Sequence, residues 1–423
     1  MLLQFSCSNY RSIKEEITFS MVSVKDTETD RRTVTFKDME VERITAIYGA
    51  NGSGKSNVIS SIEFARNQIT NSMMNQPGQL IYTFPHKLQN ERVPTKFSFH
   101  FEMNNIRYVY SFTISLGVVD EEYLYYFPNN RKIKIFTRKG MNIYPGSRYK
   151  NAFQLSLNVL QENRLFLSCA ANYSRADEIK NAFIFFSTKL VIYKVKVDEP
   201  RSNNWYEYSC RIMESRPEVK REFLKIMEYL DTGIRDIRSE MKKYTGEELT
   251  RILPAGLKDS LDALMPEIKT NGLLNMKTSV VYDEFETDLA REESTGIQKL
   301  FQMICPMLDI LETGKVLICD EIETGLHEVI VHKIIELFYE LYPERKAQFI
   351  FTTHNTSLLE SKLFRRGQIW FTELKEERAT DLYSLSEIRN VRKDENLARG
   401  YISGKYGAVP VLSGNLQSFL KTR

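Results

Sequence analysis

The stretch GANGSGKS at residues 49–56 restricts the fold of this 423-residue chain more than any other feature. It follows an apolar run at 44–48 and precedes a helical pattern at 57–68, so it has the strand–loop–helix setting of the phosphate-binding motif G-x-x-x-x-G-K-[ST]. The glycines let successive N–H groups turn toward phosphate oxygens, and the start of the helix favours the same anion. Because average residue usage gives a chance match in roughly one such chain in a hundred, the motif predicts an α/β nucleotide-binding core.

Each polar position of this P-loop has an expected role. Lys55 should reach the β- and γ-phosphates of ATP, and the Ser56 hydroxyl should ligate Mg²⁺, so ATP and Mg²⁺ are the predicted cofactors. The alternative is a turn rich in glycine and serine with a surface lysine, which the flanking strand and helix disfavour. The residues of this segment that we expect to contact the nucleotide are Asn51, Gly52, Ser53, Gly54, Lys55, Ser56 and Asn57.

The composition is typical of a globular protein, with 42% hydrophobic residues, 27% charged residues and a net charge of +3. Five dispersed cysteines without a C-x-x-C pair indicate reduced thiols and not a disulfide framework or a zinc site. The first residues do not form a basic segment followed by an apolar core, and no run approaches 18 apolar residues. These features predict a cytoplasmic protein with no membrane contact.

The periodicity of apolar residues divides the chain into three parts. Strand-like alternation recurs between residues 97 and 136 and predicts an antiparallel β subdomain after the first strand–helix unit. From about 152 to 275 the period is 3.6, which predicts a mostly helical insertion with one helix at 219–230. Strands and helices alternate again in the last third, as in a mostly parallel sheet. The predicted segments are the N-terminal half of the core with the β subdomain (1–150), the insertion (151–277) and the C-terminal half of the core (278–423).

Two further apolar strands end in polar residues that fit nucleotide chemistry. The run VLICDE at 316–321 places Asp320 at the carboxyl edge of a buried parallel strand, beside the P-loop, where it can hold the Mg²⁺ shell. Glu321 follows and is placed to act as a general base on water, a role worth about 10²- to 10⁴-fold in rate. The run FIFTTHN at 349–355 places His354 where it can touch the γ-phosphate or the attacking water. The structural alternatives are an acidic strand end and a histidine in a polar loop.

The segment ESTG at 293–296 lies at the start of a predicted helix. The Ser294 hydroxyl, the Gly296 backbone and the helix dipole together make a second anion site. A chain with one P-loop has little use for two phosphate sites, but two protomers that face each other would use both. Taken alone, a serine at this position is more often an N-cap.

The order of these motifs resembles the head of ATP-binding-cassette proteins. It is more similar to the SMC-like, AAA-labelled ATPases of bacterial anti-phage and abortive-infection systems, of the RloA/AbiL type and relatives such as the PARIS ATPase. Arg11 lies in a segment, FSCSNYRSI at 5–13, that resembles the opening motif of this family, whose arginine approaches the nucleotide. Further matches are the P-loop form at 48–57, the E-S-x-G signature at 293–296, the D-loop TGLH at 324–327, the switch histidine His354 and the tail YISGKYGAVP at 401–410.

The resemblance implies a fold, an activity and partners. The fold would be α/β, an ABC/SMC-like P-loop ATPase head with an antiparallel β subdomain and a mostly helical insertion. The protein would hydrolyse ATP between the heads of a homodimer or higher homo-oligomer. It would control a nuclease of the Toprim or RloB-like type, encoded by a neighbouring gene, in response to a phage-encoded trigger protein. The sequence departs from the family at Ile297, where threonine is frequent, and Gln89 is only a weak match to the Q-loop glutamine.

Other interpretations stay open. Residues 131–150 contain seven basic side chains and no acid, which fits contact with nucleic acid or an acidic protein but equally a solvated hairpin edge. A DNA-repair ATPase of the RecF or short-SMC type would bind DNA in a salt-sensitive way. A P-loop phosphotransferase acting on a small molecule would be a monomer, and the 293–296 segment would then have no role.

Overall fold

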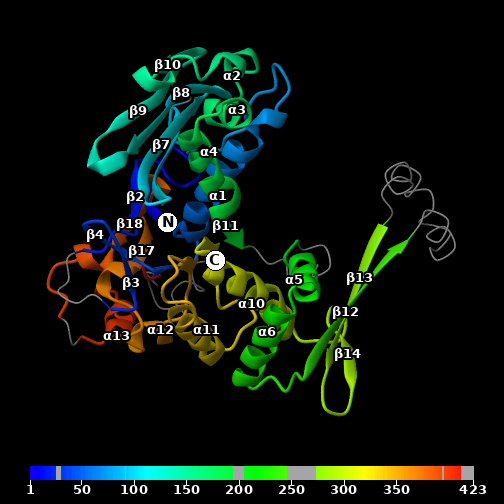
Figure 1. The fold of residues 1–423 in the computed structure, drawn as a ribbon. Coiled ribbons are helices and arrows are strands. Elements are labelled where there is room, and N and C mark those ends of the chain that lie inside the picture. Colours follow the sequence, from blue (N-terminus) through cyan, green and yellow to red (C-terminus); the bar gives the residue numbers. More distant parts are fainter. Residues whose placement is uncertain (25–29, 91, 194–203, 245–272, 393–394, 411–423) are drawn as a thin grey trace, which may run out of the picture. The chain divides into compact units, whose positions relative to one another are not determined.

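The computed structural model describes residues 1–24, 30–90, 92–193, 204–244, 273–392 and 395–410 (Figure 1). The chain forms two compact units. The first unit contains 1–193, 310–324 and 331–423, and the second contains 194–309 and 325–330. The predicted boundaries at residues 151 and 277 therefore do not coincide with the limits of the compact units, because residues 151–193 lie within the first.

The P-loop belongs to a six-stranded sheet of the first unit. Its strand order is β11 (Leu190–Tyr193), β15 (Val316–Cys319), β16 (Gln348–Thr352), β5 (Ile44–Gly49), β17 (Ile369–Leu374) and β18 (Thr380–Ser384). The first five strands are parallel, and β18 is antiparallel to β17. Every residue of β5, β15 and β16 is buried, which explains their continuous apolar sequences. The carboxyl ends of these three strands meet at one edge of the sheet.

The second large sheet of this unit is antiparallel, as predicted. Its order is β10 (Asn142–Pro145), β9 (Ile133–Lys139), β8 (Val118–Phe127), β7 (Ile106–Ser115), β6 (Thr95–Met103), β1 (Leu2–Ser8) and β2 (Ile17–Ser20). The β6–β7 hairpin turns at Asn104 and Asn105, whose φ angles of 53° and 62° are those that a two-residue hairpin loop requires. A short hairpin, β3 (Thr33–Phe36) with β4 (Met39–Glu42), precedes β5.

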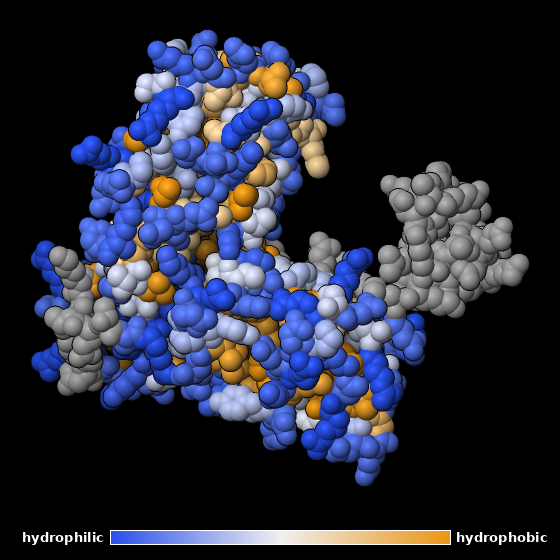
Figure 2. All heavy atoms as spheres, in the orientation of Figure 1, coloured by the Kyte–Doolittle hydropathy of each residue, from blue (hydrophilic) through white to orange (hydrophobic). Residues whose placement is uncertain are grey.

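Helices of the first unit cover one face of the antiparallel sheet (Figure 1). Phe185 stacks on Phe101 with ring centroids 4.2 Å apart, and Phe186 meets Phe99 edge to face at 5.0 Å. This aromatic core lies inside, whereas the visible face in Figure 2 is mostly hydrophilic with separate hydrophobic side chains. The helices of the whole first unit are α1 (Lys55–Asn71), α2 (Gln154–Asn158), α3 (Phe166–Tyr173), α4 (Asp177–Ile184), α11 (Glu328–Glu340), α12 (Ser357–Glu360) and α13 (Leu397–Ile402), with the first residues of α11 in the second unit.

The second unit contains helices and a small sheet. Its helices are α5 (Asn204–Ser215), α6 (Pro217–Tyr229) and most of α10 (Thr295–Thr313), and its antiparallel strands are β12 (Asp236–Tyr244), β13 (Leu273–Val281) and β14 (Glu286–Asp288). The helix predicted at 219–230 is confirmed by α6. The ring of Phe301 on α10 packs against Tyr206 and Phe223 at 5.5 and 6.1 Å between centroids. Strand β12 was not predicted, since its sequence DIRSEMKKY is too polar to show a buried face. No helix in the described part of the chain is long and apolar enough to cross a membrane.

One residue of the basic stretch at 131–150 is part of the core. Arg138 and Glu122 form an ion pair with 0% of either side chain exposed. Glu122 also accepts hydrogen bonds from the N–H groups of Phe166 and Leu167 at 2.6 and 2.8 Å. The Arg138 Nε donates to the Gly140 carbonyl at 2.6 Å. Arg138 therefore cannot contact nucleic acid, and it fastens helix α3 to the antiparallel sheet.

The substitution Arg138→Met is expected to lower the free energy of unfolding by about 3–5 kcal/mol, because it leaves a buried carboxylate without its cation. Urea unfolding followed by circular dichroism measures this loss. Lys139→Met is the matched control, since Lys139 is the exposed neighbour on the same strand and a surface change should stay within about 0.5 kcal/mol. Equal effects of the two substitutions would contradict a structural role for the buried pair.

Candidate functional site

The P-loop has a backbone that only glycine fits at its critical points. Gly54, the residue before α1, has φ 110°, and a Cβ atom there would overlap the Thr380 side chain. A Cβ atom at Gly49 would overlap the Thr372 hydroxyl. The Ser53 hydroxyl lies 2.6 Å from that of Thr372, and the Thr380 hydroxyl donates to the Ser53 carbonyl at 3.1 Å. Through Thr372 and Thr380, strands β17 and β18 thus contact the loop and fix its curvature.

Lys55 is buried and lies inside the loop. Its ammonium group donates to the carbonyl oxygens of Gly49 and Ala50 at 2.8 and 3.1 Å. Burial lowers the pKa of Lys55, and the carboxylates of Glu321 and Asp320 oppose this shift. The ammonium of Lys55 is therefore stabilised electrostatically by the carboxylates at the end of β15. It is also hydrogen-bonded to two carbonyl oxygens of the loop. A phosphate bound in the loop would be a stronger acceptor for the same ammonium.

The acidic end of β15 is organised by the last residue of β16. The Thr352 hydroxyl donates to Asp320 Oδ1 at 2.6 Å and accepts from the Glu321 N–H at 2.7 Å. Glu321 has φ 50°, a left-handed conformation that is uncommon for a residue other than glycine and that concentrates at functional sites. Its side chain is exposed and accepts from the Thr324 hydroxyl at 3.2 Å. The arrangement directs the Glu321 carboxylate to solvent, where a water molecule can meet it.

His354 follows β16 at the same edge of the sheet. Its backbone N–H donates to Glu323 Oε1 at 2.5 Å. Partial burial and the positive charge of Lys55 lower the pKa of His354, so its imidazole is neutral at neutral pH. Among the described residues, Glu323 Oε2 is buried without a hydrogen-bond partner. Glu323 was not predicted as a site residue, although its position two residues after Glu321 places it close to the acidic strand end.

The arginine of the opening motif lies beside the first turn of α1. Arg11 Nη1 donates to Asn57 Oδ1 at 3.5 Å, and its guanidinium lies over the Phe84 ring at 5.3 Å from the centroid. The Asn57 amide donates to the Ser12 hydroxyl at 2.6 Å, and that hydroxyl lies 2.7 Å from Thr380 Oγ1. The exposed Arg11 side chain is therefore next to the P-loop helix. By contrast, within the described residues no hydrogen bond joins the Gln89 side chain to the P-loop, so its Q-loop role stays a weak prediction.

The 293–296 segment belongs to the second unit and caps α10. Ser294 Oγ accepts from the Ile297 N–H at 3.3 Å, which is the geometry of an N-cap. Glu293 Oε1 accepts from the hydroxyls of Tyr282 and Thr287 at 2.9 and 2.5 Å, and this connects the turn to the residue that follows β13 and to strand β14. A Cβ atom at Gly296 would lie 2.9 Å from the Gly325 carbonyl of the predicted D-loop. Ser294 is exposed at the helix start, and its contact with a nucleotide stays a prediction.

The residues at the sheet edge suit Mg²⁺ and a nucleoside triphosphate. Ser56 is exposed in the first turn of α1, and Asp320 supplies a carboxylate at the end of β15. Magnesium prefers such oxygen ligands and is usually held by one or two protein groups together with substrate phosphates and water. The glycine cradle, the lysine and these two oxygen donors make up the expected donor set.

Comparisons with known proteins found a matching family model and solved structures with low sequence identity. The chain resembles an SMC head bound to the C-terminal winged-helix domain of ScpA, with 15% identity, a TM-score of 0.43, and coverage of 90% of this chain and 97% of that one. It resembles the SMC head domain from Thermotoga maritima with 13% identity, a TM-score of 0.42, and coverage of 90% and 98%. No match was found among curated proteins. The family model described as "AAA domain, putative AbiEii toxin, Type IV TA system" matches residues 44–142 and 219–360. These ranges contain the P-loop, the signature segment, the acidic strand end and His354, and they cover more than half of the sequence, so the chain belongs to this AAA-domain family.

Proposed function

We propose that this protein is an ABC/SMC-like ATPase that binds Mg-ATP in the P-loop and hydrolyses it. The observation that carries the proposal is the meeting of three strand ends. Lys55 follows β5, Asp320 and Glu321 follow β15, and these strands flank β16, which His354 follows. The carboxylates of Asp320 and Glu321 affect the pKa of Lys55, and Lys55 in turn affects the pKa of His354. These electrostatic interactions support the grouping of the residues at one site.

The residues divide the chemistry among them. Lys55 and the loop N–H groups hold the β- and γ-phosphates, and Ser56 and Asp320 hold Mg²⁺, which supplies charge neutralisation for the phosphates. Glu321 accepts the proton of a water molecule as the water oxygen bonds to the γ-phosphorus and the bond to the β–γ bridging oxygen breaks. The neutral His354 imidazole orients that water or contacts the γ-phosphate. Glu323 holds the His354 backbone in place through its 2.5 Å hydrogen bond.

The proposal extends to the assembly. Two protomers would enclose ATP between them, with Ser294 and Gly296 of each chain closing on the nucleotide of the other. The exposed Ser294 hydroxyl at the N-terminus of the 19-residue helix α10 supports this arrangement, because an anion is favoured at that end.

Mixing two inactive variants tests the shared site. Ser294→Arg and Lys55→Ala should each lack ATPase activity alone, because every site of either homodimer contains one defect. An equimolar mixture should recover about a quarter of the wild-type activity, since half of the dimers are mixed and each of these has one intact site. Ser294→Arg mixed with itself is the control. Absence of recovery in confirmed mixed assemblies would contradict a site shared between protomers.

We further propose that nucleotide-driven closure of the heads governs a partner effector, a nuclease of the Toprim or RloB-like type, in defence against phage. The description of the family model refers to a toxin of a toxin–antitoxin system, which supports a role in a system of more than one component. The 401–410 tail packs on the nucleotide core, where the Tyr401 ring meets those of Tyr48 and Phe371 at 5.7 and 5.5 Å. If a partner binds the closed state or the open state more tightly, the amount of bound partner would change with the nucleotide.

Co-expression with the neighbouring gene product tests this second part. A complex should be recovered in at least one of the apo, ADP and ATP states, and its amount should change between states. Tight, salt-sensitive DNA binding without such a complex would favour the DNA-repair alternative. One observation favours that alternative. Five basic residues of the β subdomain are exposed and could contact DNA: Arg131, Lys132, Lys139, Arg148 and Lys150.

A further inference from the structure

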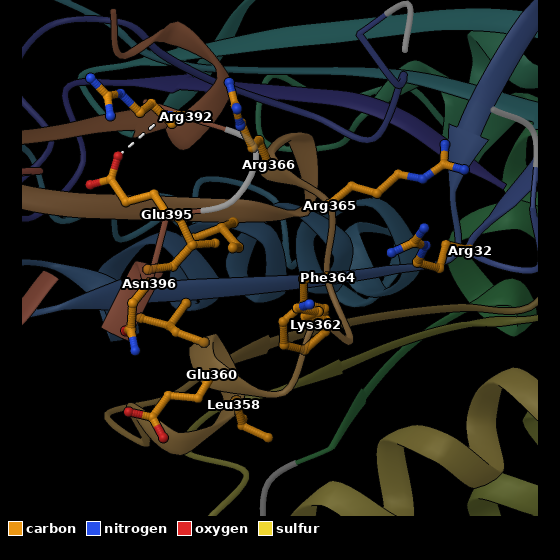
Figure 3. A pocket seen from close by; sticks show the side chains of 13 residues that line it. Arg32, Leu358, Glu360, Lys362, Phe364, Arg365, Arg366, Arg392, Glu395 and Asn396 are labelled. Carbon is orange, nitrogen blue, oxygen red and sulfur yellow. Dashed lines mark hydrogen bonds between the residues drawn. The ribbon is translucent and has the colours of Figure 1, made fainter. Parts of the chain in front are cut away.

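A cavity of about 550 Å³ in the first unit shares no lining residue with the P-loop, the acidic end of β15 or His354 (Figure 3). Its walls come from α12 and the loop that follows it, the start of β17, the start of α13, and Arg32 near the β3–β4 hairpin. Ile369, at the first position of β17, lines the cavity, whereas Thr372, three residues on, supports the P-loop. The two sites therefore lie on opposite ends of one strand, about 10 Å apart along it.

The lining of this cavity is rich in cations. Five basic residues contribute to it, whereas its carboxylates are Glu360 and Glu395. Glu395 is already engaged by Lys405 and the Tyr406 hydroxyl, which lower its pKa to about 2. The basic residues are Arg32, Lys362, Arg365, Arg366 and Arg392.

These cations fall into two groups. Arg32 and Arg365 both pair with Asp30, at 2.8 and 2.9 Å, and Figure 3 shows Arg365 extending toward Arg32. Arg366 and Arg392 form no ion pair within the described residues, and in Figure 3 they lie at the side of the cavity where Glu395 is labelled. Two guanidinium groups, for which the described residues supply no counter-ion, therefore lie beside a cavity.

The floor of the same cavity is apolar. Leu358, Leu359, Phe364 and Ile369 line it and are at most 7% exposed. Small-molecule sites in proteins have volumes of about 300–1,000 Å³ and combine an apolar lining with a few polar groups. Arginine binds phosphate in a bidentate manner, and its planar group fits this role better than lysine.

We propose that this cavity is a second ligand site that binds a small phosphorylated molecule of nucleoside-phosphate size. The phosphate lies against Arg366 and Arg392, and the less polar part of the ligand covers Leu358 and Phe364. The site is independent of ATP binding in the P-loop, so it goes beyond the ATPase activity proposed above. A polynucleotide is disfavoured, because the arginines line a cavity of about 550 Å³, which is the size of a small-molecule site.

Calorimetry on the full chain tests the site. The Lys55→Ala variant in chelator, which disables the P-loop, should still bind ADP and inorganic pyrophosphate. Adding Arg366→Gln and Arg392→Gln should weaken this binding by at least about tenfold, because each charge-assisted hydrogen bond contributes that much. Arg131→Gln with Lys132→Gln, an exposed basic pair in the β subdomain, is the matched control and should leave it unchanged.

The outcomes separate this proposal from the ATPase. ATP hydrolysis that depends on Lys55, together with no binding of either probe to the Lys55→Ala chain, would overturn the second site and leave the ATPase intact. Binding that survives Arg366→Gln and Arg392→Gln in a chain with unchanged thermal stability would also overturn it. The same holds if a single-stranded DNA 20-mer binds and the small probes do not.

Discussion

Glu321→Gln is expected to lower the rate of ATP hydrolysis by about 10²- to 10⁴-fold while ATP still binds. The amide keeps the shape of the carboxylate and can still accept from the Thr324 hydroxyl, which lies 3.2 Å from Glu321 Oε2. It cannot accept the proton of the attacking water. Because the Glu321 side chain is exposed and its backbone is held by Thr352, the substitution should leave the fold unchanged. Single-turnover hydrolysis of radiolabelled ATP, with binding measured in parallel, gives both quantities.

The control for this prediction is Glu284→Gln, which removes an exposed carboxylate from the second unit. It should hydrolyse ATP at the wild-type rate. Normal turnover by Glu321→Gln would show that another group takes the proton. Glu323 would then be the next candidate, since one of its carboxylate oxygens is buried without a partner in the part of the chain that the structure describes.

The parts of the site that the sequence predicted are those set by local pattern and strand order. An apolar run followed by Asp320 and Glu321, and another followed by His354, can be recognised in isolation. Parallel strands place their carboxyl ends at one edge, so the grouping with Lys55 followed from the fold class.

The residues that were missed depend on register between distant strands. Thr352, Thr372 and Thr380 shape the loop and the acidic strand end, but each acts on a residue at least 31 positions away in the sequence. A threonine in a strand is ordinary, and the pairing of β16 with β15, of β17 with β5 and of β18 with β17 gives these three their roles.

Charge patterns were misleading for a similar reason. Arg138 looked like one member of a solvated basic stretch, yet its side chain lies in the core because Glu122 on the adjacent strand β8 pairs with it. The arginine cavity was not predicted either, since Arg32 and Arg365 are 333 positions apart in the sequence and both pair with Asp30 in the structure. In both cases the sequence shows the charge but not its counter-ion.

Lys55→Ala is expected to weaken ATP binding by at least about 100-fold and to abolish measurable hydrolysis. Two charge-assisted hydrogen bonds to the phosphates are lost, each worth about 1.5–3 kcal/mol. The fold should survive for a specific reason. The ammonium is buried and its pKa is lowered by that burial, so its removal also relieves a desolvation cost.

Among the described residues, this ammonium donates hydrogen bonds to the carbonyls of Gly49 and Ala50 alone. These carbonyls belong to a loop whose next residues, Asn51 and Gly52, are exposed, so water can replace the lysine there. We therefore expect the free energy of unfolding to change by no more than about 1 kcal/mol. Lys150→Ala, at an exposed lysine of the β subdomain, should change neither property. Calorimetric titration with Mg-ATP and urea unfolding measure the two effects separately. Unchanged affinity and turnover in Lys55→Ala would remove the P-loop from the mechanism, and the proposed ATPase activity would have to be abandoned.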